Sequence, residues 1–131
     1  MRKHIRLIRV DPVAGTVVEM KDELLTLDRL HELTDCQTIT SFRVNETHVA
    51  YCDDNGFYKR PDENGCLPQT WFKLAGQPIV GPIVIVGMPD PMDTDGYETG
   101  CTLTVQQVED AIERFCLEPL GSTPPTRVYS P

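Results

Sequence analysis

Positive charge is scarce in this sequence. Its 131 residues include 12 lysines and arginines against 20 aspartates and glutamates, which gives a formal net charge of −8 at pH 7. A surface of this sign repels the phosphate backbones of DNA and RNA, so the composition disfavours broad non-specific binding to nucleic acid. We therefore expect no direct contact with nucleic acid, and a better fit to a protein partner with a basic surface.

Long apolar runs and paired cysteines are also missing. No stretch approaches the roughly 20 apolar residues that a membrane-spanning helix requires, and the basic start at 1–4 leads into a strand-like run instead of a signal-peptide core. The five cysteines are odd in number and form no C-x-x-C pair. We expect a cytoplasmic, reduced protein without a membrane association, whose cysteines serve mainly as small buried side chains.

Motifs for catalysis and for cofactors are absent as well. The sequence has no G-x-S-x-G, no P-loop, no G-x-G-x-x-G and no H-E-x-x-H. Asp93-x-Asp95-Gly96 is similar to the start of a calcium loop, but the third Asx residue and the closing glutamate of an EF-hand are missing. The sequence therefore predicts a protein that is not an enzyme and that uses neither a metal nor a cofactor.

One catalytic alternative stays open. His48 and Cys52 are four positions apart on a predicted strand and so share one of its faces. A thiol next to an imidazole can act as a nucleophile, although no pattern places a carboxylate to orient the pair. The alternative is a cysteine/histidine enzyme of unknown substrate.

The most distinctive stretch that is present is apolar and β-branched. Residues 83–86 read Ile-Val-Ile-Val between Gly81-Pro82 and Gly87. A run with no polar position favours a strand that is covered on both faces. Proline cannot donate to a β-ladder, so the predicted central strand starts at Pro82 and spans 82–87.

The remaining elements predict a small α+β domain over 1–116 with a mixed or antiparallel sheet. A hairpin is expected over 4–20, and a strand pair over 37–44 and 47–52. Two helices are expected over about 26–33 and 104–115. A proline-rich tail follows over 117–131.

Three local patterns add detail to this fold. The first helix carries a leucine stripe formed by Leu24, Leu27, Leu30 and Leu33. The second helix begins with the capping-box pattern of Thr104 and Gln107. Between them, residues 67–74 are expected to form a short helix or turn from which Trp71 and Phe72 fill the core.

The order of these features resembles a small domain-of-unknown-function family that is carried by bacteriophages, plasmids and other mobile elements. The resemblance covers residues 4–115, and its most specific parts are the block at 79–87 and the Leu-Thr-x-x-Gln-Val helix start at 103–108. Gln69 stands where the family pattern has asparagine after Leu-Pro. The family supplies no catalytic residues, and the resemblance implies a mobile-element origin, where small acidic proteins often act by binding host factors.

We therefore predict a non-enzymatic acidic binding protein that inhibits a host defence protein or a nucleic-acid-handling protein. Its carboxylates would occupy a basic groove on that host protein. The predicted partner-binding surface consists of three residues on the outer face of the second helix and three in the loop over 88–100: Glu109, Asp110 and Glu113, with Asp93, Asp95 and Glu98.

A second hypothesis is a small-ligand protein that binds or sequesters a nucleotide. Arg6 and Arg9 would supply positive charge to such a ligand, and Trp71 would supply a stacking surface. Formation of a homodimer is left open by the sequence.

Overall fold

The computed structural model describes residues 3–12, 14–54, 70–92 and 96–116, and it describes the backbone alone for residues 70, 71 and 114–116. Some predictions lie outside these described residues. They concern residues 67–69 of the predicted short helix or turn, the carboxylates Asp93 and Asp95, the side chain of Trp71 and the proline-rich tail over 117–131.

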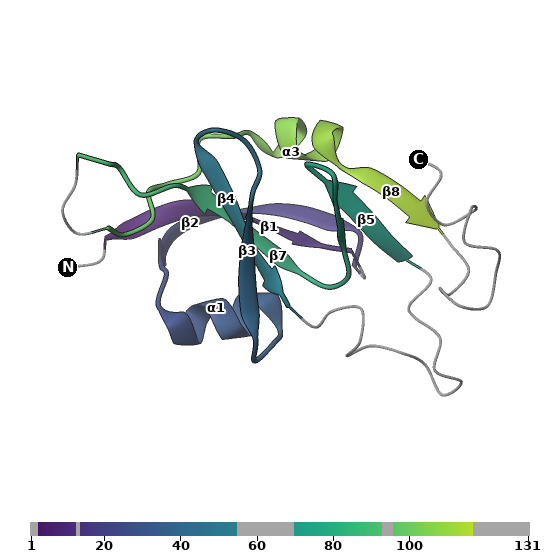
Figure 1. Ribbon diagram of the computed structural model, residues 1–131, viewed down its shortest axis with the longest axis horizontal. Helices are drawn as coiled ribbons and strands as arrows, with labels where there is room; N and C mark the ends of the chain where they lie inside the picture. The colour runs from purple at the N-terminus through teal and green to yellow at the C-terminus, as the bar shows by residue number, and fades with distance from the viewer. Residues whose placement is uncertain (1–2, 13, 55–69, 93–95, 117–131) are drawn as a thin grey trace.

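Two antiparallel sheets and two helices make up the described fold, which confirms the predicted α+β class (Figure 1). The five-stranded sheet has the order β2 (Thr16–Leu24), β1 (His4–Asp11), β7 (Ile83–Gly87), β4 (His48–Asp53) and β3 (Ile39–Arg43). The three-stranded sheet has the order β6 (Gln77–Ile79), β5 (Thr70–Leu74) and β8 (Glu113–Cys116). Helix α1 (Leu27–Thr34) and helix α3 (Val105–Ala111) lie on opposite sides of the larger sheet (Figure 1).

Strand β7 is the centre of the larger sheet, as its composition predicts. It pairs with β1 on one side and with β4 on the other. All four residues from Ile83 to Val86 are fully buried, because both faces of the strand are covered. Burying a side chain of this size contributes about 1.5–3 kcal/mol, so this strand alone supplies a large part of the hydrophobic stabilisation.

The two faces of the larger sheet belong to two separate hydrophobic clusters. On the first face, Ile83 and Ile85 pack in a cluster that also contains Ile8, Ala50, Phe72, Leu74, Ile79 and Val108. On the second face, Val84 and Val86 pack with Leu7, Leu25, Leu30 and Leu33. The first cluster joins the larger sheet to the smaller sheet and to α3, and the second joins it to α1.

The N-terminal hairpin and the first helix form where they are predicted, with one correction. Strand β2 continues beyond the predicted end at residue 20, and its last residue, Leu24, pairs with His4. Thr26 caps α1 by accepting a hydrogen bond from the backbone N–H of Arg29. The predicted leucine stripe is wrong for Leu24 and Leu27, which are exposed, because Leu24 belongs to the strand and the buried Leu25 fills the core position.

The second helix is shorter than predicted. The capping box of Thr104 and Gln107 is present and starts α3 at the expected place. The helix ends at Ala111, however, and residues 113–116 form strand β8, which pairs with β5. The prediction of a helix to residue 115 fails because the ladder with β5 provides an alternative set of backbone hydrogen bonds, and a single-sequence pattern does not show that partner.

The prediction of a short helix or turn over 67–74 is also wrong where the structure describes it. Residues 70–74 form β5, between β6 and β8. Phe72 is buried in the cluster between the two sheets, which confirms its predicted place in the core.

Candidate functional site

The carboxylates predicted to bind a partner are only partly brought together. Glu109 and Asp110 are exposed on α3, and Glu113 is exposed at the start of β8 because the helix has already ended. Glu98 is half-buried and accepts a hydrogen bond of 2.9 Å from the hydroxyl of Tyr51. The described acidic site is therefore the set Glu109, Asp110 and Glu113, which we call the α3 acidic site.

The α3 acidic site is part of a strongly unbalanced surface. Among the side chains that the structure describes, only three lysines or arginines are exposed, namely Lys3, Lys21 and Arg43. In the same part of the chain, ten carboxylates are exposed: Asp22, Asp28, Glu32, Asp35, Glu46, Asp54, Asp90, Glu109, Asp110 and Glu113. The described side chains include 15 carboxylates and 7 lysines or arginines in all, so the ratio of ten to three among the exposed ones is steeper than the ratio in the same part of the chain.

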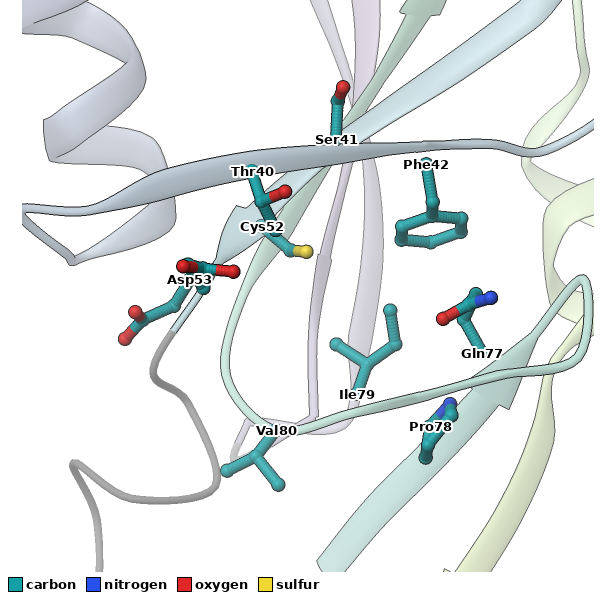
Figure 2. A pocket seen from close by; sticks show the side chains of 10 residues that line it. Thr40, Ser41, Phe42, Cys52, Asp53, Gln77, Pro78, Ile79 and Val80 are labelled. Atoms are coloured by element: carbon teal, nitrogen blue, oxygen red, sulfur yellow. The ribbon is translucent and has the colours of Figure 1, made fainter.

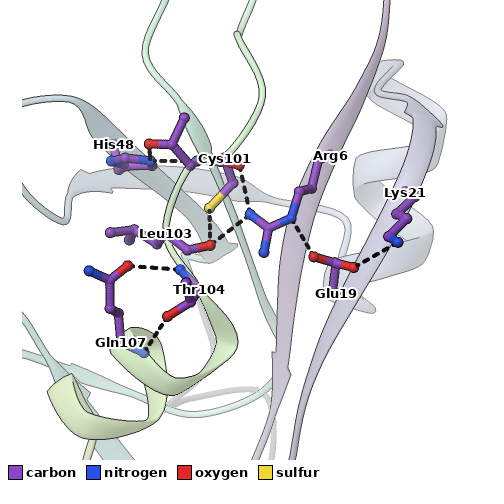
Figure 3. A network of polar contacts seen from close by, with 9 residues as sticks. Arg6, Glu19, Lys21, His48, Cys101, Leu103, Thr104 and Gln107 are labelled. Carbon is purple, nitrogen blue, oxygen red and sulfur yellow. Dashed lines mark hydrogen bonds and ion pairs between the residues drawn. The ribbon is translucent and has the colours of Figure 1, made fainter.

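Arg6 shows why positive charge is missing from this surface. Its Nε donates to Glu19 at 2.6 Å, and one terminal nitrogen donates to the carbonyl oxygens of Cys101 at 2.7 Å and Leu103 at 2.6 Å (Figure 3). The guanidinium thus connects the segment before α3 to β1. The hydrogen bond from Arg6 is the largest cause of a lowered pKa of Glu19, and the positive charge of Arg6 adds to it.

Arg9 is held in a similar way on the other face of the same strand. Its Nε donates to the carbonyl oxygen of Leu33 in the last turn of α1 at 2.8 Å, and its terminal nitrogen lies 3.5 Å from Asp11. A cation at a helix C-terminus stabilises the negative end of the helix dipole. The nucleotide hypothesis requires Arg6 and Arg9 to lie close together. The structure does not bring them together.

His48 is buried and fully engaged by hydrogen bonds. The backbone N–H of Thr102 donates to its Nε2 at 3.1 Å, so that nitrogen carries no proton and the neutral ring holds its proton on Nδ1. Nδ1 lies 3.1 Å from the Asn45 side-chain oxygen and 2.9 Å from the Thr47 hydroxyl. Burial lowers the pKa of His48, which keeps the imidazole neutral.

Cys52 follows two residues beyond Ala50 on the same face of β4 and is also buried. Burial raises the pKa of its thiol to about 11, and the nearby Cys36, Asp53 and Asp54 add to this effect. A reactive cysteine needs the opposite environment, in which the thiolate is stabilised. Among the hydrogen bonds of the described residues, none joins this thiol to His48.

A pocket of about 420 Å³ lies where the two sheets separate (Figure 2). Its walls come from β3, from the end of β4 and from the β6 segment: Thr40, Ser41, Phe42, Cys52, Asp53, Asp54, Gln77, Pro78, Ile79 and Val80. The sequence analysis did not predict this pocket, because β3 and β6 belong to different sheets and no local pattern shows that they approach each other.

Two further kinds of site are not found in the part of the chain that the structure describes. No group of three or more His, Cys, Asp or Glu side chains there could hold a metal ion. No helix there has the length and apolar character to cross a membrane.

Comparisons with models of protein families, with curated proteins and with solved structures each find no match to this chain. The resemblance to a mobile-element family stays a prediction.

Proposed function

We propose that this protein is a non-enzymatic binding protein that captures a partner through a basic surface on that partner. The observation that carries the proposal is the imbalance of exposed charge, ten carboxylates against three lysines or arginines among the described side chains. Charge complementarity of this kind accelerates encounter and rejects partners of the wrong sign.

Two of the three carboxylates of the α3 acidic site lie where the helix dipole disfavours negative charge, although Asp110 accepts a hydrogen bond of 2.8 Å from the side chain of Gln106. Glu109 and Asp110 lie in the last turn of α3, and that turn has no basic residue. Carboxylates at a helix C-terminus are disfavoured by the helix dipole, typically by about 0.3–1 kcal/mol. Asp28 offers a contrast, because it lies in the first turn of α1, where a carboxylate stabilises the helix. A binding role accounts for carboxylates at a position that costs helix stability.

The mobile-element resemblance suggests which partners to examine. A host defence protein or a nucleic-acid-handling protein presents a basic groove to phosphate groups, and an acidic protein can occupy that groove instead. Competition between this protein and duplex DNA for such a partner is the expected behaviour.

A pair of matched variants tests the proposal. The first is Glu109→Gln, Asp110→Asn and Glu113→Gln, and the control is Asp22→Asn, Glu32→Gln and Glu46→Gln, which removes the same formal charge elsewhere on the surface. The measurement is the affinity for a fluorescent oligolysine peptide, by anisotropy, at about 20 mM and about 200 mM salt, between which the Debye length falls from roughly 20 Å to roughly 7 Å.

The native protein is expected to bind the peptide at low salt and to release it at high salt. The first variant is expected to bind about tenfold more weakly, which corresponds to about 1.4 kcal/mol, and the control only about two- to threefold more weakly. Equal losses in the two variants, or no binding by the native protein, would contradict the proposal.

A further inference from the structure

Strand β3 forms one edge of the larger sheet, and its hydrogen bonds to β4 show which of its backbone groups point outward. The N–H of Asp54 donates to the carbonyl oxygen of Thr38 at 2.8 Å, and the N–H of Val44 donates to that of His48 at 3.0 Å. The register between these two positions has no shift, so even-numbered residues of β3 direct their backbone groups to β4 and odd-numbered residues direct theirs away from it. The outward residues are therefore Ile39, Ser41 and Arg43.

The outward backbone groups of β3 are open to another chain. Among the described residues, no hydrogen bond uses the backbone N–H or C=O groups of Ile39, Ser41 and Arg43. Thr40, Ser41 and Arg43 are exposed, so the edge is accessible. A row of unpaired backbone groups at a sheet edge is a template for pairing with a further strand.

Two other sheet edges carry features that hinder such pairing. Pro78 in β6 has no N–H to donate. Strand β2 has an interrupted register with β1 and a φ of 56° at Asp22, within a run of three charged residues at 21–23. Strand β3, which is described in full, contains no proline, no register shift and no carboxylate. It is therefore the edge that is best suited to accept a strand.

We propose that β3 pairs with β3 of a second copy of this chain, antiparallel and about a two-fold axis at Ser41. In this register Ser41 lies opposite Ser41 and Ile39 lies opposite Arg43, so every outward residue meets an outward residue and exchanges both of its N–H···O bonds with it. The same patch serves both copies, as two-fold symmetry requires, and the two five-stranded sheets become one. This self-association goes beyond the proposed capture of a basic partner and uses none of the α3 acidic site.

The charge of β3 supports a second copy as the occupant. Two molecules that each carry a net charge of −8 repel each other, but β3 has no carboxylate and includes Arg43, an exposed cation. In the proposed register Arg43 lies opposite Ile39 of the second copy, on the face of the sheet that α1 covers. The C-terminal end of α1 carries the exposed carboxylates Glu32 and Asp35. Each arginine therefore approaches a region of negative charge on the other copy.

The dimer is expected to be weak and to be strengthened by salt. A contact between two five-residue strands is smaller than the roughly 1,200–2,000 Å² that stable interfaces bury. Salt screens the repulsion between the two acidic molecules, so the dimer gains stability as the ionic strength rises. Capture of a basic ligand by the α3 acidic site has the opposite salt dependence. Failure of one proposal is thus distinguishable from failure of the other.

Sedimentation equilibrium of the full-length protein tests the dimer, with a reducing agent present so that no intermolecular disulfide forms. We expect a monomer at about 10 μM and a dimer with a dissociation constant of about 100 μM in about 500 mM salt. In about 20 mM salt the dissociation constant is expected to be at least tenfold higher. A protein that stays monomeric at millimolar concentration in high salt, or a dimer that salt dissociates, would overturn the proposal.

Two pairs of variants locate the contact. Ser41→Pro removes the outward N–H at the two-fold axis and leaves the bonds between β3 and β4 in place, whereas Ser41→Ala keeps that N–H. The proline variant is expected to dimerise at least tenfold more weakly and the alanine variant as the native protein does. Arg43→Glu is expected to weaken the dimer several-fold, and Lys21→Glu, the same charge change on the exposed lysine of β2, is expected to leave it unchanged. Native dimerisation by Ser41→Pro, or equal losses in the two glutamate variants, would refute the assignment.

A measurement on the native protein gives the register without any variant. Residues that lie opposite each other without exchanging hydrogen bonds bring their Cα atoms to about 4.5 Å. In the proposed dimer these residues are Thr40 of one copy and Phe42 of the other. An isotope-filtered nuclear Overhauser experiment on mixed labelled and unlabelled protein is expected to show a contact between their Cα protons. Intermolecular contacts at β2, and none at β3, would contradict the proposed interface.

Discussion

At the scale of single residues, His48 shows how one buried polar side chain fixes a connection between distant parts of the chain. Its imidazole lies on β4 and accepts the backbone N–H of Thr102, 54 positions further along the chain. The hydrogen bond is part-buried, and a bond of this kind contributes about 0.5–1.5 kcal/mol, so it helps to hold the segment that leads into α3. The contact requires a neutral ring, which makes it sensitive to pH.

The lowered pKa of His48 sets the direction of that sensitivity. Above its ordinary pKa of 6.5, the imidazole is neutral in the folded and unfolded chains, and the full stability is present. As the pH falls below that value, the unfolded chain takes up the proton first, so the free energy of unfolding decreases until the pH passes the lowered pKa of the folded state.

We expect this loss to be smaller in His48→Gln. The glutamine oxygen can still accept a hydrogen bond from the N–H of Thr102 but does not titrate. His4 and His31 are present in both proteins, so the difference between the two pH profiles reports on position 48 alone. Urea unfolding at pH 8, 7, 6 and 5 measures the free energy of unfolding of both proteins. Parallel pH profiles for the native protein and the variant would show that this imidazole does not couple folding to pH.

At the scale of elements, the end of β7 is held by a close backbone contact with Thr99. Gly87 exchanges backbone hydrogen bonds of 2.9 Å and 3.0 Å with Thr99. A Cβ atom at Gly87 would collide with the Thr99 hydroxyl and lie 2.7 Å from the carbonyl oxygen of Gly100. The absence of a side chain at this position is what allows the segment to approach.

Gly87→Ala is therefore expected to lower the free energy of unfolding by about 1–3 kcal/mol, the usual range for overpacking. Removing the hydroxyl with Thr99→Ala should restore part of this loss, because one of the two close contacts is then relieved. Denaturant unfolding of both single variants and the double variant gives the coupling energy between the two sites. A coupling energy of zero would mean that the collision with Thr99 is not the cause.

The elements that could be predicted are those with a local signal. The run at 83–86 identified the buried central strand, and Thr104 with Gln107 identified the start of α3. The end of that helix could not be predicted, because it depends on pairing between β8 and β5, about 40 residues apart. For the same reason, the sequence did not show that residues 70–74 form a strand.

At the scale of the whole molecule, folding turns arginines inward, so the surface formed by the described residues is more acidic than the composition of those residues. Arg6 and Arg9 donate to backbone carbonyls inside the fold, and Arg29 lies 2.9 Å from Glu23. The sequence predicted the net charge but not this inward use of arginines, which depends on tertiary contacts. The pocket between the sheets was unpredictable for the same reason, since β3 and β6 belong to different sheets.

The most direct test of the account is to map where a basic ligand meets the folded protein. Titration of the full-length protein with oligolysine, followed by backbone amide shifts, should give its largest and most salt-sensitive changes at residues 105–113, around Glu109, Asp110 and Glu113. Smaller changes are expected at Asp28 and Glu32 on α1, although these two carboxylates are exposed like those of the α3 acidic site. Changes spread evenly over all exposed carboxylates, or centred on α1, would contradict the assignment of partner binding to the α3 acidic site.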